Sequence, residues 1–133
     1  MPARVLVVWD QAAFAENAAS WLTRAGYDAI APISPMAALD LLDGSQRIEM
    51  LITCTDFARG QPNGVALARM AKLKQPKIKV VLVGLPEHAN LVRDLCGFRA
   101  GPVSLRELVD TVVQHLVAQS APPVLFIEAT SAA

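Results

Sequence analysis

The sequence has 133 residues, a length that predicts one folded domain with a sizeable core. Hydrophobic residues make up 53% and charged residues 18%, which excludes the polar, charge-rich class of disordered chains. Twelve basic residues balance twelve acidic ones, so no net field favours nucleic acid or an anionic membrane as a partner.

The number of cysteines and the length of the apolar runs indicate in which cellular compartment the protein is found. Cys54 and Cys96 are too few for a disulfide framework and lack the paired spacing of a zinc site. The N-terminal residues do not carry a signal-peptide core, and no apolar run is long enough to span a membrane. We therefore expect a cytoplasmic protein.

The first half of the chain predicts two strands, each followed by a helix. Residues 5–8 form a continuous apolar run, typical of a buried central strand, and residues 28–33 predict a second strand. Helices are expected over residues 11–25, with Gly26 as a left-handed stop, and from the N-cap Ser34 to Gly44. Spacings of three and four define the expected inward faces, which carry Phe14, Ala18, Trp21, Leu22 and Ala25 in the first helix and Met36, Leu39 and Leu42 in the second.

The second half continues this alternation of strands and helices. Strands are predicted at residues 49–54, 78–83 and 98–100. One helix begins near Asn63-Gly64 and ends at Pro76, a short helix is expected over 86–95, and the capping box from Ser104 to Glu107 opens the last helix. The first of these helices carries the apolar residues Val65, Leu67, Ala68, Met70, Ala71 and Leu73, and the expected inward face of the last carries Leu105, Leu108, Val109, Val112, Val113 and Leu116.

The pattern predicts a domain over residues 1–118 and a tail over residues 119–133. The tail holds the apolar run 124–127, which has strand propensity although the domain is already complete without it. We expect this run either to extend the sheet or to pair with another chain, for example in a homodimer.

Strands linked by crossover helices predict an open, doubly wound parallel sheet, which binds ligands outside the carboxyl ends of its strands. The positions there are Trp9 and Asp10, then Cys54 to Asp56, then Gly84, and finally Gly101 and Pro102. Few of these side chains can act as nucleophiles, acids, bases or metal ligands.

Several of these segments resemble one known family, the receiver domains of bacterial two-component response regulators. The resemblance spans residues 4–116 and rests on Arg4-Val5-Leu6-Val7-Val8 before an acidic position, Ala25-Gly26-Tyr27, Asn63-Gly64 and the run from Pro102 to Leu108. It implies a flavodoxin-like, CheY-like α/β fold: a five-stranded parallel sheet of order 2-1-3-4-5 with helices on both faces.

The resemblance also implies which residues carried the family's chemistry. Receivers hold Mg²⁺ with two acids after the first strand and accept a phosphoryl group on an Asp that ends the third strand. A hydroxyl after the fourth strand and a Lys after the fifth contact that group. The matching positions here are, in order, Trp9, Asp10, Cys54, Gly84 and Gly101, so only Asp10 is retained. We expect a pseudo-receiver without phosphoryl chemistry, without enzymatic activity and without a cofactor.

Two alternatives stay open at this stage. Alignment on Asn63-Gly64 places Asp56 at the acceptor position, where Asp56 and Asp10 would together hold Mg²⁺ in an atypical receiver. Cys54 could instead be a redox-sensing thiol, because strand ends beside helix N-termini can depress a thiol pKa. We favour Cys54 at the acceptor position, with a structural role, because the run from Glu49 fits the family strand without a shift.

A protein partner is the remaining expectation: a histidine kinase, another regulator or a second copy of the chain. No acid lies between Asp56 and Glu87, and the basic residues there suit either an acidic partner or a solvated helix face. His88 and His115 are isolated in the sequence and suggest surface or capping roles. The basic residues are Arg59, Arg69, Lys72, Lys74, Lys77 and Lys79.

Overall fold

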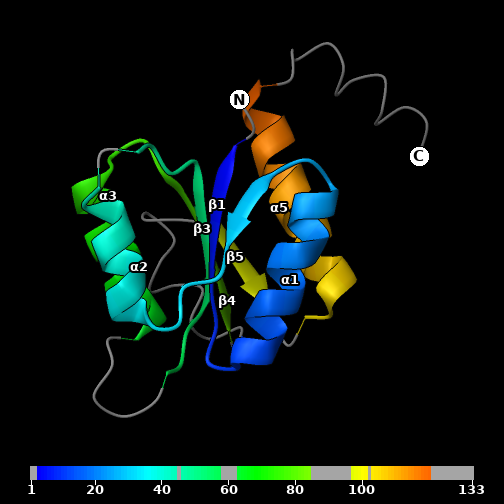
Figure 1. The fold of residues 1–133 in the computed structure, drawn as a ribbon, viewed down its shortest axis with the longest axis horizontal. Helices are drawn as coiled ribbons and strands as arrows, with labels where there is room; N and C mark the ends of the chain where they lie inside the picture. The colour runs from blue at the N-terminus through cyan, green and yellow to red at the C-terminus, as the bar shows by residue number, and fades with distance from the viewer. Residues whose placement is uncertain (1–2, 45, 58–62, 85–96, 102, 121–133) are drawn as a thin grey trace.

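The computed structural model describes residues 3–44, 46–57, 63–84, 97–101 and 103–120, and Figure 1 shows a sheet between two layers of helices. Several expectations lie outside these residues. They are the short helix over 86–95, the tail run 124–127, and the positions Arg59, His88, Cys96 and Pro102.

All neighbouring strands in the sheet are parallel. The strands are β1 (Arg4–Val8), β2 (Asp28–Ile30), β3 (Met50–Cys54), β4 (Lys79–Gly84) and β5 (Gly97–Ala100), in the order β2-β1-β3-β4-β5. The predicted parallel α/β fold is therefore confirmed.

Among the described elements, helices cover both faces of the sheet (Figure 1). Helices α1 (Ala12–Arg24) and α5 (Leu105–Ser120) pack on one face, and α2 (Pro35–Leu42) and α3 (Gly64–Lys74) pack on the other. Strand β1 contributes side chains to both hydrophobic cores. Val5 and Val7 lie in the core beneath α1 and α5. Leu6 and Val8 lie in the core beneath α2 and α3. Burial on both faces explains why β1 and β4 are continuous apolar runs.

Local signals set the helix ends. The Ser34 hydroxyl accepts a hydrogen bond from the Ala37 amide at the start of α2. At the start of α5, the Glu107 carboxylate accepts from the Ser104 amide and the Ser104 hydroxyl accepts from the Glu107 amide. Gly26 follows α1 with a φ of 103°, in the left-handed region. These predicted caps are confirmed.

Several predicted boundaries and faces were wrong. Strand β2 ends at Ile30 and helix α2 ends at Leu42, both earlier than predicted, and α5 runs to Ser120. Alanines such as Ala38 contact the sheet because small side chains let a helix approach closely. Trp21 and Met36, which the pattern assigns to apolar helix faces, are 41% and 54% exposed, and Met70 and Leu73 of α3 are 36% and 82% exposed. None of the described helices combines the length and hydropathy needed to cross a lipid bilayer.

A glutamine side chain links three chain segments at the end of the sheet where the strands begin. Gln75 follows α3, and its side-chain oxygen accepts a hydrogen bond from the Ile48 amide at 2.8 Å. Its side-chain nitrogen donates to the carbonyl oxygens of Leu42 and Gln46, at 3.1 and 3.2 Å. One amide group therefore ties the end of α2 and the approach to β3 to the end of α3.

Candidate functional site

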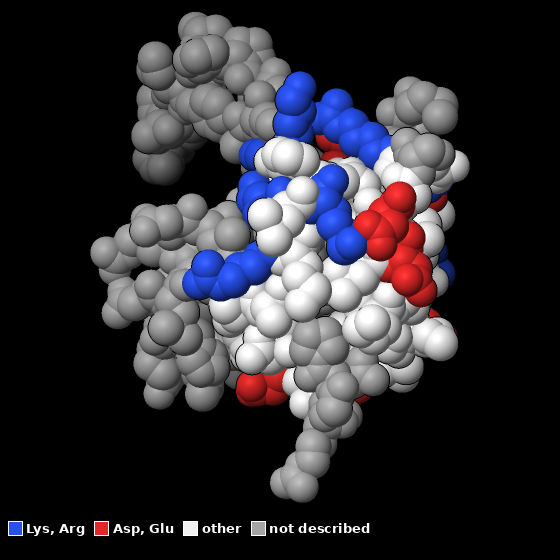
Figure 2. Space-filling view, turned by 90° about the vertical axis from the view of Figure 1, so that its left-hand side faces the viewer, with Lys and Arg blue, Asp and Glu red and all other residues white. Residues whose placement is uncertain are grey.

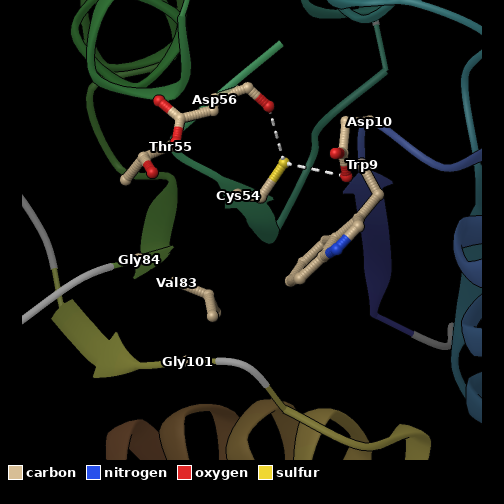
Figure 3. A pocket seen from close by; sticks show the side chains of 8 residues that line it. All are labelled: Trp9, Asp10, Cys54, Thr55, Asp56, Val83, Gly84 and Gly101. Carbon is tan, nitrogen blue, oxygen red and sulfur yellow. Dashed lines mark hydrogen bonds between the residues drawn. The ribbon is translucent and has the colours of Figure 1, made fainter.

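The carboxyl ends of the strands enclose a cavity of about 220 Å³. Strand pairing aligns them, since Val8 pairs with Thr53, Cys54 with Val83, and Gly84 with Ala100. Figure 3 shows the eight lining residues, which are Trp9, Asp10, Cys54, Thr55, Asp56, Val83, Gly84 and Gly101.

Cys54 is the last residue of β3, and its thiol lies between two oxygen acceptors. The thiol donates to the backbone oxygen of Asp56 at 3.3 Å and lies 3.8 Å from Oδ1 of Asp10. Burial, with a further contribution from the Asp10 charge, raises the pKa of Cys54 to about 12. The cysteine is therefore a neutral thiol at physiological pH, which disfavours the redox-sensor alternative.

Trp9 directly follows β1. Its side chain lines the cavity and also packs against the hydrophobic core. Its ring lies 5.0 Å from the ring of Phe14, at a tilt of 40°, and both side chains pack against the core beneath α1 and α5. In Figure 3 the indole extends into the cavity on the side of Val83. Trp9 thus brings an aromatic surface to the site, where the family resemblance implies an acid.

The two acids of the cavity are not arranged as a pair. Asp10 and Asp56 are both exposed, and in Figure 3 the Asp56 carboxylate points away from Asp10, with the Cys54 thiol between them. Within the described residues, no three His, Cys, Asp or Glu side chains are grouped so that they could hold a metal ion. Mg²⁺ requires near-octahedral oxygen ligation, so this donor set does not fit it.

The sequence placed Thr55 at this edge only as part of the run from Cys54 to Asp56, and it did not single out Val83 or Gly64 as site residues. Thr55 is only 6% exposed; its amide donates to the Val83 oxygen at 3.1 Å and its oxygen accepts from the Gly64 amide at 2.8 Å. A Cβ on Gly64 would collide with the Cys54 carbonyl. The Asn63-Gly64 pair and the position of Thr55 beside Cys54 were the available signals.

The wall of the cavity that contains Gly84 and Gly101 consists of backbone rather than side-chain atoms. The Gly101 amide donates to the Gly84 oxygen at 2.9 Å. A Cβ on Gly101 would lie 2.9 Å from Cγ1 of Val83, so a side chain there would force Val83 to move. The hydroxyl and lysine that the resemblance implies are both replaced by residues without side chains.

The predicted basic band is divided among several environments. Lys72 donates to the Ile78 oxygen, Lys74 pairs with Asp43, and Lys79 donates to the backbone oxygen of His115 on α5. Of the members of this band that the structure describes, only Arg69 and Lys77 are exposed without such a contact. Figure 2 shows Lys and Arg gathered at one end of the face covered by α2 and α3, beside acidic residues. The two interpretations of this band, a surface for an acidic partner or a solvated helix face, stay predictions.

His115 has a structural environment. Its Nδ1 lies 2.8 Å from the Thr111 oxygen, one turn earlier in α5. Its Nε2 fills the space beside Gly97, where a Cβ would approach within 3.0 Å. The predicted surface or capping role is thus replaced by a packing role against β5.

Solved structures that share this architecture are response regulator receiver domains. A receiver protein from Pseudomonas putida superimposes with a TM-score of 0.72 at 27% identity, over 86% of this chain and 98% of that chain. One from Sinorhizobium medicae gives 0.69 at 24% identity, over 85% and 93%. A CheY-like receiver domain protein from Methanospirillum hungatei gives 0.78 at 18% identity, over 90% and 98%. This chain has the receiver fold.

The likeness lies in structure more than in sequence. No protein-family model and no curated protein matches the sequence. The receiver fold places the cavity of Figure 3 at the carboxyl ends of its strands, where open parallel α/β sheets hold their ligands. Function must be argued from the residues of that cavity, because one fold supports many functions.

Proposed function

We propose that this chain is a pseudo-receiver, which accepts no phosphoryl group and acts in two-component signalling by binding a protein partner. The observation that carries this proposal is the neutral Cys54 thiol at the end of β3. A thiol cannot form the acyl phosphate that a carboxylate forms. It is also a poor ligand for Mg²⁺, which prefers oxygen.

The rest of the cavity supports the same proposal. Phosphoryl transfer depends on cations and hydrogen-bond donors that stabilise the transferring oxygens. Among the described lining residues there is no Lys, Arg or His, and Gly84 and Gly101 provide no side-chain donor. Trp9 adds an apolar ring beside Asp10. Charge stabilisation of a transferring phosphoryl group is therefore lacking in this part of the site.

An atypical receiver that uses Asp56 is the second candidate. Its support is that Asp56 is exposed and lines the cavity, so a small phosphodonor could reach its carboxylate. The orientation of that carboxylate away from Asp10 argues against a shared Mg²⁺ ion. The two candidates therefore differ in whether a covalent phosphoryl adduct forms.

The partner, we propose, is a histidine kinase, another regulator or a second copy of this chain. Support comes from α3, whose Met70 and Leu73 are exposed beside Arg69, with Lys77 following the helix. Exposed apolar side chains next to unpaired cations suit a partner surface with an apolar centre and acidic rim. The fixed positions of Lys72, Lys74 and Lys79 make them weaker candidates for such contacts.

Intact-mass measurement after incubation with Mg²⁺ and acetyl phosphate tests the proposed loss of phosphoryl chemistry. We expect no phosphoryl adduct on the parent chain, under conditions that label an unrelated active receiver in parallel. An adduct that disappears in Asp56→Asn but persists in Cys54→Ser would replace the proposal with the atypical receiver. An adduct that disappears in Cys54→Ser would establish thiol chemistry instead.

A further inference from the structure

The described lining of the cavity carries negative charge without a compensating cation. Asp10 and Asp56 supply two carboxylates, and no Lys, Arg or His is among the eight described lining residues. Neither acid belongs to any ion pair within the described part of the chain. The hydrogen bond from the Cys54 thiol to Asp10 is long, at 3.8 Å, and leaves that carboxylate largely unsatisfied by protein groups.

A buried hydroxyl in the same cavity also lacks a partner. Thr55 is only 6% exposed, and its backbone groups are hydrogen-bonded to Val83 and Gly64, but its hydroxyl makes no hydrogen bond within residues that the structure describes. Buried hydroxyls are normally satisfied, and leaving one without a partner is costly. In Figure 3 the Asp56 carboxylate lies on the Thr55 side of the cavity. An N–H donor placed there would satisfy both groups.

An aromatic ring lines the cavity on another side. The Trp9 indole is held by its contact with Phe14 and extends into the space between Cys54 and Val83 (Figure 3). The face of an indole attracts ammonium and guanidinium groups, and more strongly when water is excluded. Trp9 and Asp10, which are adjacent in sequence, therefore offer an organic cation both a ring and a carboxylate.

An anion finds little to bind in the same place. The amino end of α3 adjoins Cys54, but three of its first four backbone N–H groups already have partners, all except that of Val65. The Gly64 amide donates to Thr55, and the Ala66 and Leu67 amides donate to the side chain and the backbone oxygen of Asn63. The usual attraction of a helix N-terminus for phosphate is thereby weakened.

We propose that this cavity binds an organic cation with N–H donors, an ammonium or guanidinium group. The group would donate to Thr55 and to the carboxylates of Asp10 and Asp56, with its apolar stem against Trp9. It would belong either to a free amine or to a Lys or Arg side chain of the partner. Only the second source rests on the proposed function.

Titration with n-propylammonium chloride, followed by the backbone and indole N–H signals in NMR spectra, tests this binding. We expect a saturable shift of the signals of Trp9, Thr55 and Asp56. At equal ionic strength, 1-propanol, propionate and inorganic phosphate should produce no saturable shift at these residues. Equal binding of propionate or phosphate, or displacement of the amine by a lower concentration of Mg²⁺, would overturn the proposal.

Three variants test the contacts and one serves as a matched control. Asp10→Asn, Asp56→Asn and the near-isosteric Thr55→Val should each raise the Kd for propylammonium about fivefold or more, because each removes a charge-assisted hydrogen bond. Asp40→Asn removes an exposed acid of α2 that does not line the cavity, and should leave the Kd unchanged. Unchanged affinity in both aspartate variants would refute the assignment.

A blocked lysine, N-acetyl-lysine N-methylamide, distinguishes the two sources of the cation. Binding about tenfold or more tighter than propylammonium, lost on acetylation of the ε-amine, identifies a protein side chain. Binding of propylammonium alone identifies a free amine. These titrations contain no phosphodonor, so their failure leaves the proposed loss of phosphorylation intact. Conversely, a phosphoryl adduct on Asp56 would not affect the measured affinity for the amine.

Discussion

At the scale of single residues, Cys54 determines the chemical character of the cavity. Its thiol occupies the end of the central strand, receives no cationic neighbour among the described lining residues, and faces the carboxylate of Asp10. Partial burial and, to a smaller extent, the nearby negative charge of Asp10 both disfavour the thiolate. The residue thus fills space and donates a weak hydrogen bond.

We expect Cys54 to react slowly with alkylating reagents in the folded protein. Because burial raises its pKa from 9.0 to about 12, the thiolate fraction at pH 8 falls about 1000-fold. A more basic thiolate is also more nucleophilic, so alkylation by iodoacetamide should be about 30-fold or more slower than in the urea-unfolded chain. Mass spectrometry of the Cys54 peptide separates its labelling from that of Cys96. Similar rates in the folded and unfolded chains would contradict this expectation.

The same shift predicts a pH dependence of stability. The unfolded thiol loses its proton near pH 9 while the folded thiol keeps it, so the free energy of unfolding should fall as the pH rises above 9. The decline between pH 8 and pH 10.5 should be smaller in Cys54→Ser, which has no group titrating at this position. Urea titrations at the two pH values measure the difference.

The sequence predicted which residues lie near the cavity, but not the directions in which their side chains point. The strand pattern placed Cys54 and Asp56 near the cavity, and both line it. Nothing in the spacing showed that the Asp56 carboxylate points away from Asp10, because that direction depends on the backbone after β3. The spacing also did not show that the Thr55 hydroxyl has no hydrogen-bond partner among the described residues, because that depends on its neighbours in space.

At the scale of elements, the junction of β3 and α3 fixes one wall of the cavity. Gly64 begins α3 so close to β3 that its amide reaches Thr55 and its missing Cβ leaves room for the Cys54 carbonyl. Asn63 then caps the helix through its side chain. A larger residue at position 64 must separate the helix from the strand.

Gly64→Ala should therefore destabilise the protein by about 2 kcal/mol or more, through overpacking against backbone that cannot retreat. Chemical denaturation measures this change. The matched control is Ala66→Gly, the opposite change in the same helical turn, which should cost about 1 kcal/mol or less. A loss below about 0.5 kcal/mol for Gly64→Ala would show that the junction is adaptable.

Element positions could be predicted because their signals are local. The Ser34 cap and the Ser104 to Glu107 box involve residues three apart, and both form as expected. Helix faces were less predictable, since periodicity shows which residues share a face but not how much of that face contacts the sheet. Leu73 and Trp21 lie outside those contacts and remain exposed.

At the scale of the whole molecule, the sheet ends in two short edges. Strand β2 has three residues and β5 has four, and each pairs with one neighbour within the described sheet. Short edges limit unplanned strand pairing. They still leave backbone groups that a strand from a second copy could use, in keeping with the proposal that one partner is this chain itself.

Removing residues 121–133 tests the role of the tail in self-association. If the apolar run 124–127 pairs with another copy, light scattering should show a dimer for the full chain and a monomer for the chain ending at Ser120. Far-UV circular dichroism should stay similar, because the described core members end at Leu116. The same mass for both chains would contradict a dimer formed by the tail.

Gln75, at the end of the sheet remote from the cavity, makes this corner of the domain sensitive to a single added charge. A glutamate in its place would set a carboxylate against the carbonyl oxygens of Leu42 and Gln46, which now receive its N–H bonds. Repulsion between these oxygens would weaken the link of both segments to α3, leaving the Lys74–Asp43 ion pair to hold the end of α2. Such a chain would loosen at the base of the domain, while the end that carries the cavity stayed in place.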